Sequence, residues 1–215
     1  MPALFVTFEG PEGCGKTTQV RLLAERLRAR GYDVLTTREP GGTRIGDQIR
    51  AILLNPAHTE MVPAAEILLF SAARAQIVHE VILPHLQRGG IVLCDRFADS
   101  TLAYQGYGHG LNLDVLRVIT AFATAGLTPD VTFYLDIPVE EGLRRKAQAG
   151  QAEWNRMEQR ELAYHQRVQD GYRRLIAAEP TRWVVIDAGK SIEDIHMQVM
   201  QEVERRLAVC QDTVR

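Results

Sequence analysis

The stretch Gly10-Pro11-Glu12-Gly13-Cys14-Gly15-Lys16-Thr17 decides the fold of this chain. It matches G-x-x-x-x-G-K-[ST], the pattern of a phosphate-binding P-loop. Glycines in such a loop let backbone N–H groups approach phosphate oxygens, and the following helix adds positive potential. The lysine reaches the β- and γ-phosphates, and the threonine hydroxyl holds Mg²⁺. We therefore expect these residues and Thr18 to bind ATP, with Lys16 catalytic and Thr17 a metal ligand.

The residues on either side of the loop support this interpretation. Leu4 to Phe8 is a short apolar run typical of a buried strand. After Lys16 the apolar positions recur at helical spacing, at Val20, Leu23, Ala24 and Leu27. A glycine-rich turn with a chance lysine is the alternative. It is disfavoured because the P-loop requires a strand before it and a helix after it.

Strand and helix patterns alternate along the rest of the chain. Four further strands are predicted at residues 33–37, 91–94, 131–135 and 183–186. Helices are predicted near residues 45–53, at 63–87 with a possible interruption near Pro84, at 113–125, on both sides of residues 147–155, and after a cap at Ser191. This alternation predicts an α/β fold, a five-stranded parallel sheet with helices on both faces.

Composition excludes several classes of protein. The 215 residues suffice for a single domain, residues 1–215. A net charge of −2 gives no electrostatic footprint for nucleic acid. We see no apolar run that approaches the length of a membrane span, so no membrane partner is expected. The three cysteines are far apart in sequence, which argues against a disulfide framework or metal cluster and favours the cytoplasm.

Charged residues follow the predicted strands where a ligand site is expected. In parallel sheets, ligands gather at the carboxyl ends of the strands. Asp95 follows an apolar strand, which is the Walker B arrangement for Mg²⁺, and Arg96 beside it could clamp a phosphate. The alternative is a strand-end ion pair. The P-loop favours the functional interpretation, so we expect Asp95 and Arg96 to be catalytic.

Three further blocks resemble the signatures of bacterial thymidylate kinases. They are Arg38-Glu39-Pro40-Gly41-Gly42-Thr43, Phe70-Ser71-Ala72-Ala73-Arg74, and the segment from Asp95 to Gly106 that ends in Tyr104-Gln105-Gly106. Their order and spacing also match, from the first strand to the last helix. The resemblance implies a P-loop nucleoside-monophosphate kinase fold with a small lid. It also implies the conversion of ATP and dTMP to ADP and dTDP with Mg²⁺, and a homodimer.

The resemblance also implies a dTMP site. Phe70 would stack on thymine, and Arg74 would donate to its O4, which favours thymine over cytosine because arginine has only donors. Spacing alone favours a core Phe70 and a solvated Arg74; the surrounding blocks reverse this interpretation. Further contacts to dTMP are implied for Glu12, Arg38, Arg96, Thr101, Tyr104 and Gln105, with Tyr104 against the sugar and the two arginines on the phosphate.

The lid separates this chain from part of the family. Some thymidylate kinases carry an arginine in the variable part of the P-loop, whereas Pro11 to Cys14 contain none. The lid, at about residues 144–158, would then supply the catalytic charge, with Arg156 favoured and Arg144 second. Glu158 is predicted to contact the metal. Asn155 stands where the family commonly has aspartate, and Arg145 and Lys146 are more typical of a solvated surface.

Two other functions remain open from the sequence. One is another deoxynucleoside or nucleoside-monophosphate kinase. The other is a P-loop switch that hydrolyses ATP slowly to regulate a partner. Phe70, Arg74 and Arg96, which suit a phosphate acceptor, argue against the switch.

Overall fold

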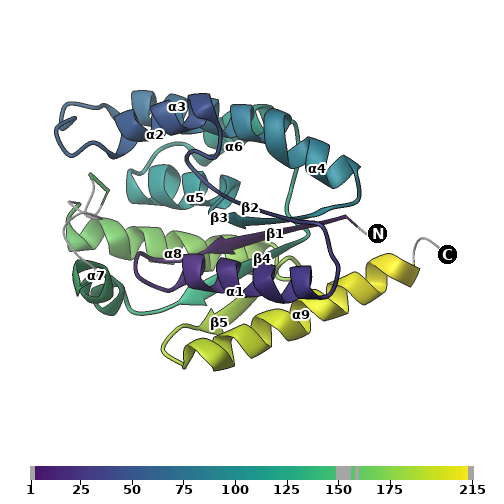
Figure 1. Ribbon diagram of the computed structural model, residues 1–215. Helices are drawn as coiled ribbons and strands as arrows, with labels where there is room; N and C mark the ends of the chain where they lie inside the picture. Colours follow the sequence, from purple (N-terminus) through teal and green to yellow (C-terminus); the bar gives the residue numbers. More distant parts are fainter. Residues whose placement is uncertain (1–2, 149–155, 158–159, 213–215) are drawn as a thin grey trace.

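The chain forms a twisted sheet enclosed by helices, as Figure 1 shows. In the computed structural model, residues 3–148, 156–157 and 160–212 are described. The strands are β1 (Leu4–Glu9), β2 (Val34–Arg38), β3 (Ile91–Asp95), β4 (Val131–Asp136) and β5 (Trp183–Asp187). They pair in the order β2-β3-β1-β4-β5, and every pair is parallel. The predicted five-stranded parallel sheet is therefore confirmed.

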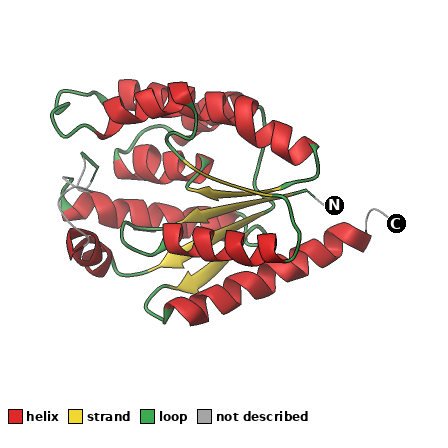
Figure 2. Cartoon of the chain, in the orientation of Figure 1, coloured by secondary structure: helices red, strands yellow, loops and turns green. Residues whose placement is uncertain are grey.

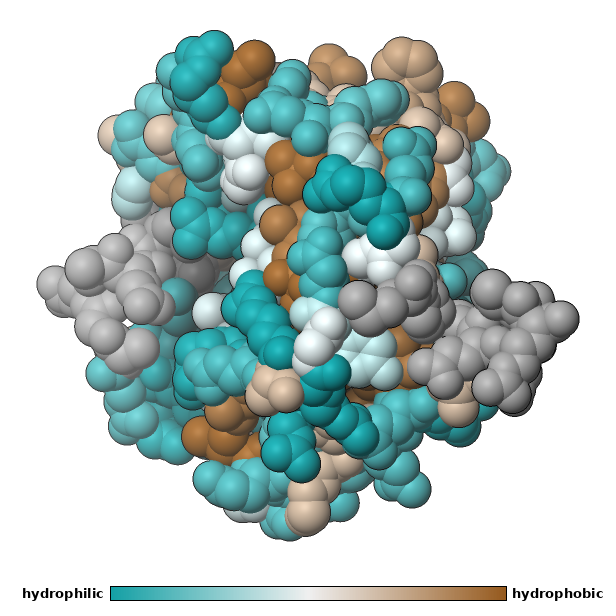
Figure 3. Space-filling view, turned by 45° about the vertical axis from the view of Figure 1, so that its right-hand side comes forward, coloured by the Kyte–Doolittle hydropathy of each residue, from teal (hydrophilic) through white to brown (hydrophobic). Residues whose placement is uncertain are grey.

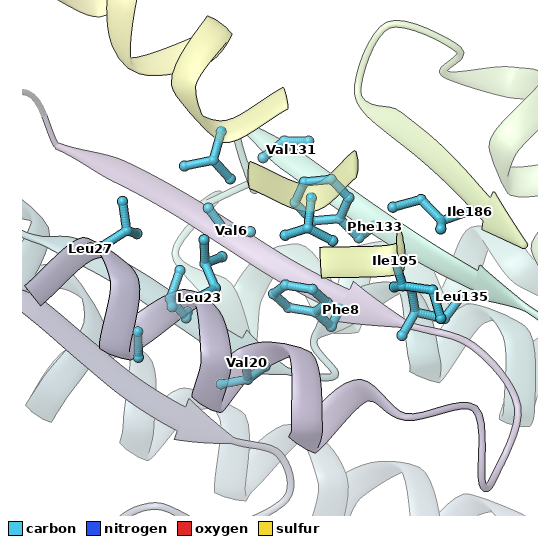
Figure 4. Close-up of a cluster of buried hydrophobic side chains, with 14 of the residues drawn as sticks. Val6, Phe8, Val20, Leu23, Leu27, Val131, Phe133, Leu135, Ile186 and Ile195 are labelled. Carbon is cyan, nitrogen blue, oxygen red and sulfur yellow. The ribbon is translucent and has the colours of Figure 1, made fainter. Parts of the chain in front are cut away.

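The central strands are apolar because helices cover both of their faces (Figure 2). All six residues of β1 are buried. On one face, α1 (Lys16–Ala29) and α9 (Ile192–Asp212) pack against the sheet. Figure 4 shows Leu23 of α1 and Ile195 of α9 among the side chains of β1 and β4, such as Phe8 and Phe133. This core fixes the P-loop, which joins β1 to α1.

The other face carries most of the remaining helices (Figure 1). These are α2 (Arg44–Leu54), α3 (Pro63–Ile77), η1 (Val78–Ile82), α4 (Leu83–Gln87), α5 (Ala98–Thr101), η2 (Leu102–Gly108), α6 (Leu113–Thr124) and α8 (Leu162–Ala178). Helix α7 (Val139–Gln148) lies beside the P-loop, where its Gly142 approaches Gly13. Helix α8 packs along the π-helical segment η2, where Tyr104 and Tyr172 are in edge-on ring contact. The α5–η2 segment was not expected from the sequence pattern, because its apolar residues are few and interrupted by glycines.

The expected interruption near Pro84 is a change of helix type. Residues 63–87 form one continuous helix in which the π-helical turn η1 precedes Pro84. Pro84 then occupies the first turn of α4, where a missing backbone N–H does little harm.

The same helix corrects the expectation about membrane spans. By length and composition alone, Pro63–Gln87 would suffice to cross a membrane, with a mean hydropathy of 1.4. In the fold it packs against the sheet, with Ile77 and Ile82 in the core and Glu66 and Arg74 buried in ion pairs. These contacts are those of a core helix.

Candidate functional site

The P-loop has the backbone geometry that its glycines predict. Gly13 has a φ of +68°, and a Cβ there would lie 2.2 Å from the carbonyl oxygen of Gly142. Gly15 has a φ of +95° and caps the N-terminus of α1 without a side-chain hydrogen bond. The first N–H groups of α1 therefore remain available to an anion. Any other residue at Gly13 would collide with α7.

Lys16 lies within its own loop. Its Nζ donates to the carbonyl oxygens of Pro11 at 2.7 Å and Gly10 at 3.2 Å, and lies 3.4 Å from Sγ of Cys14. Both Lys16 and Cys14 are buried. Cys14 is thus a small residue that fills the loop, and the ammonium of Lys16 is placed by the local backbone.

The two predicted metal ligands meet beside the loop. Thr17 Oγ1 donates to Asp95 Oδ2 at 2.6 Å, which joins the P-loop to the end of β3. Hydroxyl and carboxylate oxygens are the donors that Mg²⁺ prefers, and Mg²⁺ usually takes only one or two protein ligands beside phosphate and water. The described residues contain no group of three or more His, Cys, Asp or Glu side chains placed to hold a metal. This pair fits Mg²⁺. Glu158 lies outside the described residues.

A single cleft of about 1500 Å³ opens at the carboxyl ends of β1, β2 and β3. Most of the predicted site residues line it: Glu12, Gly13, Gly15, Lys16, Thr17, Thr18, Arg38, Phe70, Arg74, Asp95, Arg96, Thr101, Tyr104 and Gln105. Gly10, Pro11, Cys14, Arg144 and Arg156 do not line it. The P-loop and the acceptor-side residues therefore share one cavity.

Arg96 is the centre of a buried network on the floor of this cleft. Its φ of +69° is unusual for a residue with a side chain. One guanidinium nitrogen donates to Glu12 at 2.6 Å, another donates to Tyr172 at 3.3 Å, and the group lies over the ring of Tyr104. The buried carboxylate of Glu9 accepts from Phe97 N and Tyr172 and holds the turn that aims Arg96. Backbone strain of this kind gathers at functional sites.

Glu12 is held as a carboxylate by these partners. Burial by itself would raise its pKa, but Arg96 and Lys16 outweigh burial and lower the pKa to about 2. The hydroxyl of Tyr104 also donates to Glu12 at 3.1 Å. Glu12 thus ties the P-loop to η2 across the acceptor side of the cleft.

The residues predicted to read the base come together on α3 and the start of η2. Phe70 is half-buried and lines the cleft. Arg74 is buried, and it donates to Glu39 at 2.7 Å, to Thr101 at 2.8 Å and to the carbonyl oxygen of Phe97 at 3.2 Å. Gln105 donates to Glu66 at 2.7 Å.

The lid arginines lie apart from the P-loop. Arg144 is exposed and pairs with Glu141 on its own helix. Arg156 is buried, donating to Glu66 and to the carbonyl oxygen of Leu53. To reach a transferring phosphoryl group, Arg156 would have to leave Glu66. The catalytic roles of Arg144 and Arg156 stay predictions.

Sequence reasoning missed several residues of the cleft. Arg50 of α2 lines it and donates to the carbonyl oxygen of Pro40. Glu39 lies within a recognised block but received no role. Arg145 and Lys146 also line the cleft, and Arg145 donates to the carbonyl oxygen of Ala188 at 3.1 Å. Only the cationic character of Arg50, Arg145 and Lys146 was visible in the sequence, because the contacts that place them span distant segments.

Comparisons with known proteins identify relatives of this chain. Residues 8–199 match the family model described as "Thymidylate kinase". The chain is 63% identical to a thymidylate kinase of Roseiflexus sp. (strain RS-1) over 96% of both proteins, and 51% identical to one of Deinococcus radiodurans over 94% of this chain and 97% of that protein. The crystal structure of a thymidylate kinase from Ehrlichia chaffeensis superimposes with a TM-score of 0.78 at 33% identity, covering 94% of this chain and 100% of that one.

Proposed function

Since this chain belongs to the thymidylate kinase family and phosphorylates dTMP to dTDP, we propose how its own residues divide that reaction. One observation carries the proposal: the P-loop and the acceptor-side residues line the same cleft. Residues 1–215 would form a single kinase domain with a lid at about residues 144–158. The buried, unpaired thiols of Cys14 and Cys94 suit the cytoplasm.

On the donor side, the P-loop holds the phosphates of ATP. The free N–H groups at the start of α1 and the ammonium of Lys16 take the β- and γ-phosphates. Thr17 and Asp95 would hold Mg²⁺, which neutralises charge that develops on the phosphate oxygens when it is bound.

On the acceptor side, Arg38 and Arg96 hold the phosphate of dTMP in line with the γ-phosphorus. A phosphate oxygen of dTMP forms the new bond to that phosphorus, and the bond to the β,γ-bridging oxygen breaks as ADP leaves. The charge on Arg96 is secured by Glu12, and the ring of Tyr104 closes the space beside the sugar. Positioning and positive charge thus do most of the work.

Recognition of the base falls to α3 and η2. Phe70 offers its face to thymine, and Arg74 offers N–H donors to O4. Thr101 and Gln105 line the same part of the cleft and supply further polar contacts. Cytosine presents an amino donor where thymine presents O4, so Arg74 disfavours it.

We assign the chain to the subtype whose lid supplies the catalytic cations. The P-loop contains no arginine. Arg144 and Arg156 are the proposed contributors, with Arg156 released from Glu66 when it acts.

We also propose that the chain forms a homodimer, with neither nucleic acid nor membrane as a partner. The apolar helix near residues 66–83 could cover a partner or belong to the core. Ile67, Ile77 and Val78 of that helix are core residues, whereas Leu68 is 61% exposed. Neighbouring α6 adds Val115, Val118 and Phe122, and Phe122 is 86% exposed. On the face in Figure 3, hydrophilic side chains predominate, although hydrophobic ones lie at its top and in a central band. Sedimentation should give a dimer that dissociates in a Val118→Asp, Phe122→Asp variant; a wild-type monomer would contradict the proposal.

A coupled assay of ADP release tests the function. dTMP, dUMP, dCMP, dAMP and thymidine are compared as acceptors at saturating ATP. The highest kcat/KM is expected for dTMP. A higher value for another acceptor would contradict the assignment, and ATP hydrolysis that no acceptor accelerates would indicate a switch protein.

A further inference from the structure

Glu39 and Arg74 form a buried pair that lines the cleft, and Glu39 has no assigned role. The side chain of Arg74 is 1% exposed and that of Glu39 3% exposed, and Nε of Arg74 donates to Oε2 of Glu39 at 2.7 Å. A buried charge needs a partner, because desolvation penalises it heavily otherwise. Glu39 is the only carboxylate that pairs with Arg74 among the described residues.

Three acceptors on different segments fix the plane of this guanidinium. Glu39, just after β2, takes Nε, while Thr101 of α5 takes one terminal nitrogen and the carbonyl oxygen of Phe97 takes the other. An arginine has five N–H donors in a rigid plane. Each terminal nitrogen therefore keeps one N–H, and Arg74 lines the cleft. The three contacts together decide where those remaining donors point.

The position of Glu39 is fixed through its backbone. Its N–H donates to the carbonyl oxygen of Asp95 at 3.0 Å, next to the metal-binding end of β3. Its second carboxylate oxygen, Oε1, is buried and has no hydrogen-bond partner among the described residues. The carboxylate is thus committed to Arg74, and its negative charge supplies the strongest of the three contacts.

We infer that Glu39 is a positioning residue that aims Arg74 at O4 of thymine and thereby sets the preference for thymine over cytosine. This inference rests on the proposed contact between Arg74 and the base. Without the charge of Glu39, Arg74 keeps only neutral acceptors, which hold it more weakly, and its plane can tilt. A tilted plane loses its bond to O4 and rejects the amino group of cytosine less sharply.

Glu39→Gln tests the inference, because it removes the charge and keeps the size. We expect the KM for dTMP to rise about tenfold, which corresponds to the loss of one charge-assisted hydrogen bond. The kcat should change much less. The inhibition constant of dCMP against dTMP should change little, so the preference falls. dUMP has the same O4 as dTMP, and the ratio of their KM values should stay constant. Glu39→Asp, which retains the charge, should restore part of the preference.

Two further variants make each outcome decisive. Glu80→Gln changes an exposed carboxylate on the continuous helix that also carries Arg74, and it should leave every kinetic parameter unchanged. Arg74→Ala should abolish the preference for dTMP over dCMP. If it does so and Glu39→Gln does not, the inference is wrong and the base contact stands. If Arg74→Ala also leaves the preference unchanged, the base contact and the inference both fail. If Glu39→Gln proves too unstable to assay, Glu39→Asp decides: an unchanged preference with a shorter, displaced carboxylate would overturn the inference.

Discussion

Lys16 of the P-loop and Arg156, the arginine proposed for the lid, are both cations, but they are held in different ways. Lys16 is held by carbonyl oxygens five and six residues before it. Arg156 is held by Glu66 on α3, 90 residues before it in the sequence, and by the backbone of Leu53 at the end of α2, 103 residues before it. The first arrangement is complete within one loop. The second exists only once the fold has brought three segments together.

The largest effect is expected for Lys16, which is held by the backbone of its own loop. Lys16→Ala should lower kcat about a hundredfold to a thousandfold, because the β- and γ-phosphates lose a preorganised charge. Steady-state kinetics with dTMP measures it, and Arg26→Ala on the same helix is the matched control. Turnover near that of the wild type would refute the role of Lys16.

Arg156→Ala tests the arginine that is held by residues distant in the sequence. Glu66 loses its nearest cation but keeps Gln105, His109 and Arg160 as partners, so the free energy of unfolding should fall by about 1–3 kcal/mol, measured by denaturant titration. If Arg156 acts on the transferring group, kcat should also fall more than the affinity for dTMP.

Glu66→Gln is the control that separates the two roles of Arg156. It weakens the same buried pair and leaves the arginine in place. Retained kcat in Glu66→Gln, with reduced kcat in Arg156→Ala, would support catalysis. Equal losses in both variants would show that Arg156 only anchors the lid.

A smaller effect is expected at Tyr104, which joins the two sides through its bond to Glu12. Tyr104→Ala should improve the kcat/KM for UMP relative to dUMP by about tenfold, because the space beside the sugar opens. Tyr104→Phe keeps the ring and should leave the ratio unchanged. An unchanged ratio in the alanine variant would remove Tyr104 as the sugar gate.

The smallest effect concerns pH and Glu39. Burial raises the pKa of Glu39 to about 7, although Arg74 on α3 lowers it. Glu9 on β1 also raises this pKa, and the thiol of Cys94 on β3 is another titratable group nearby. The carboxylate is charged above that pH and becomes protonated below it. The KM for dTMP should therefore rise severalfold as pH falls from 8 to 6.

The substrate phosphate titrates in the same range, so the comparison with Glu39→Gln is essential. That variant retains only the part of the pH dependence that belongs to dTMP. Identical profiles for the wild type and the variant would contradict the role of Glu39.

Much of this protein was readable from local pattern. The P-loop, the five strands and the proposed metal ligands Thr17 and Asp95 follow from short stretches, since apolar runs form buried strands and the positive φ angles of Gly10, Gly13 and Gly15 favour glycine. Strand ends in a parallel sheet share one edge, so the position of the cleft was readable too.

Only the tertiary structure determined which buried charged side chains pair with each other. The sequence contains Glu39, Glu66, Arg74 and Arg156, but not the pairing of Glu39 with Arg74 and of Glu66 with Arg156. Nor does it place Arg50 in the cleft. The physical reason is that a buried charge takes the partner that the packing of distant segments brings within reach, whereas backbone conformation in a glycine-rich loop depends on its own residues.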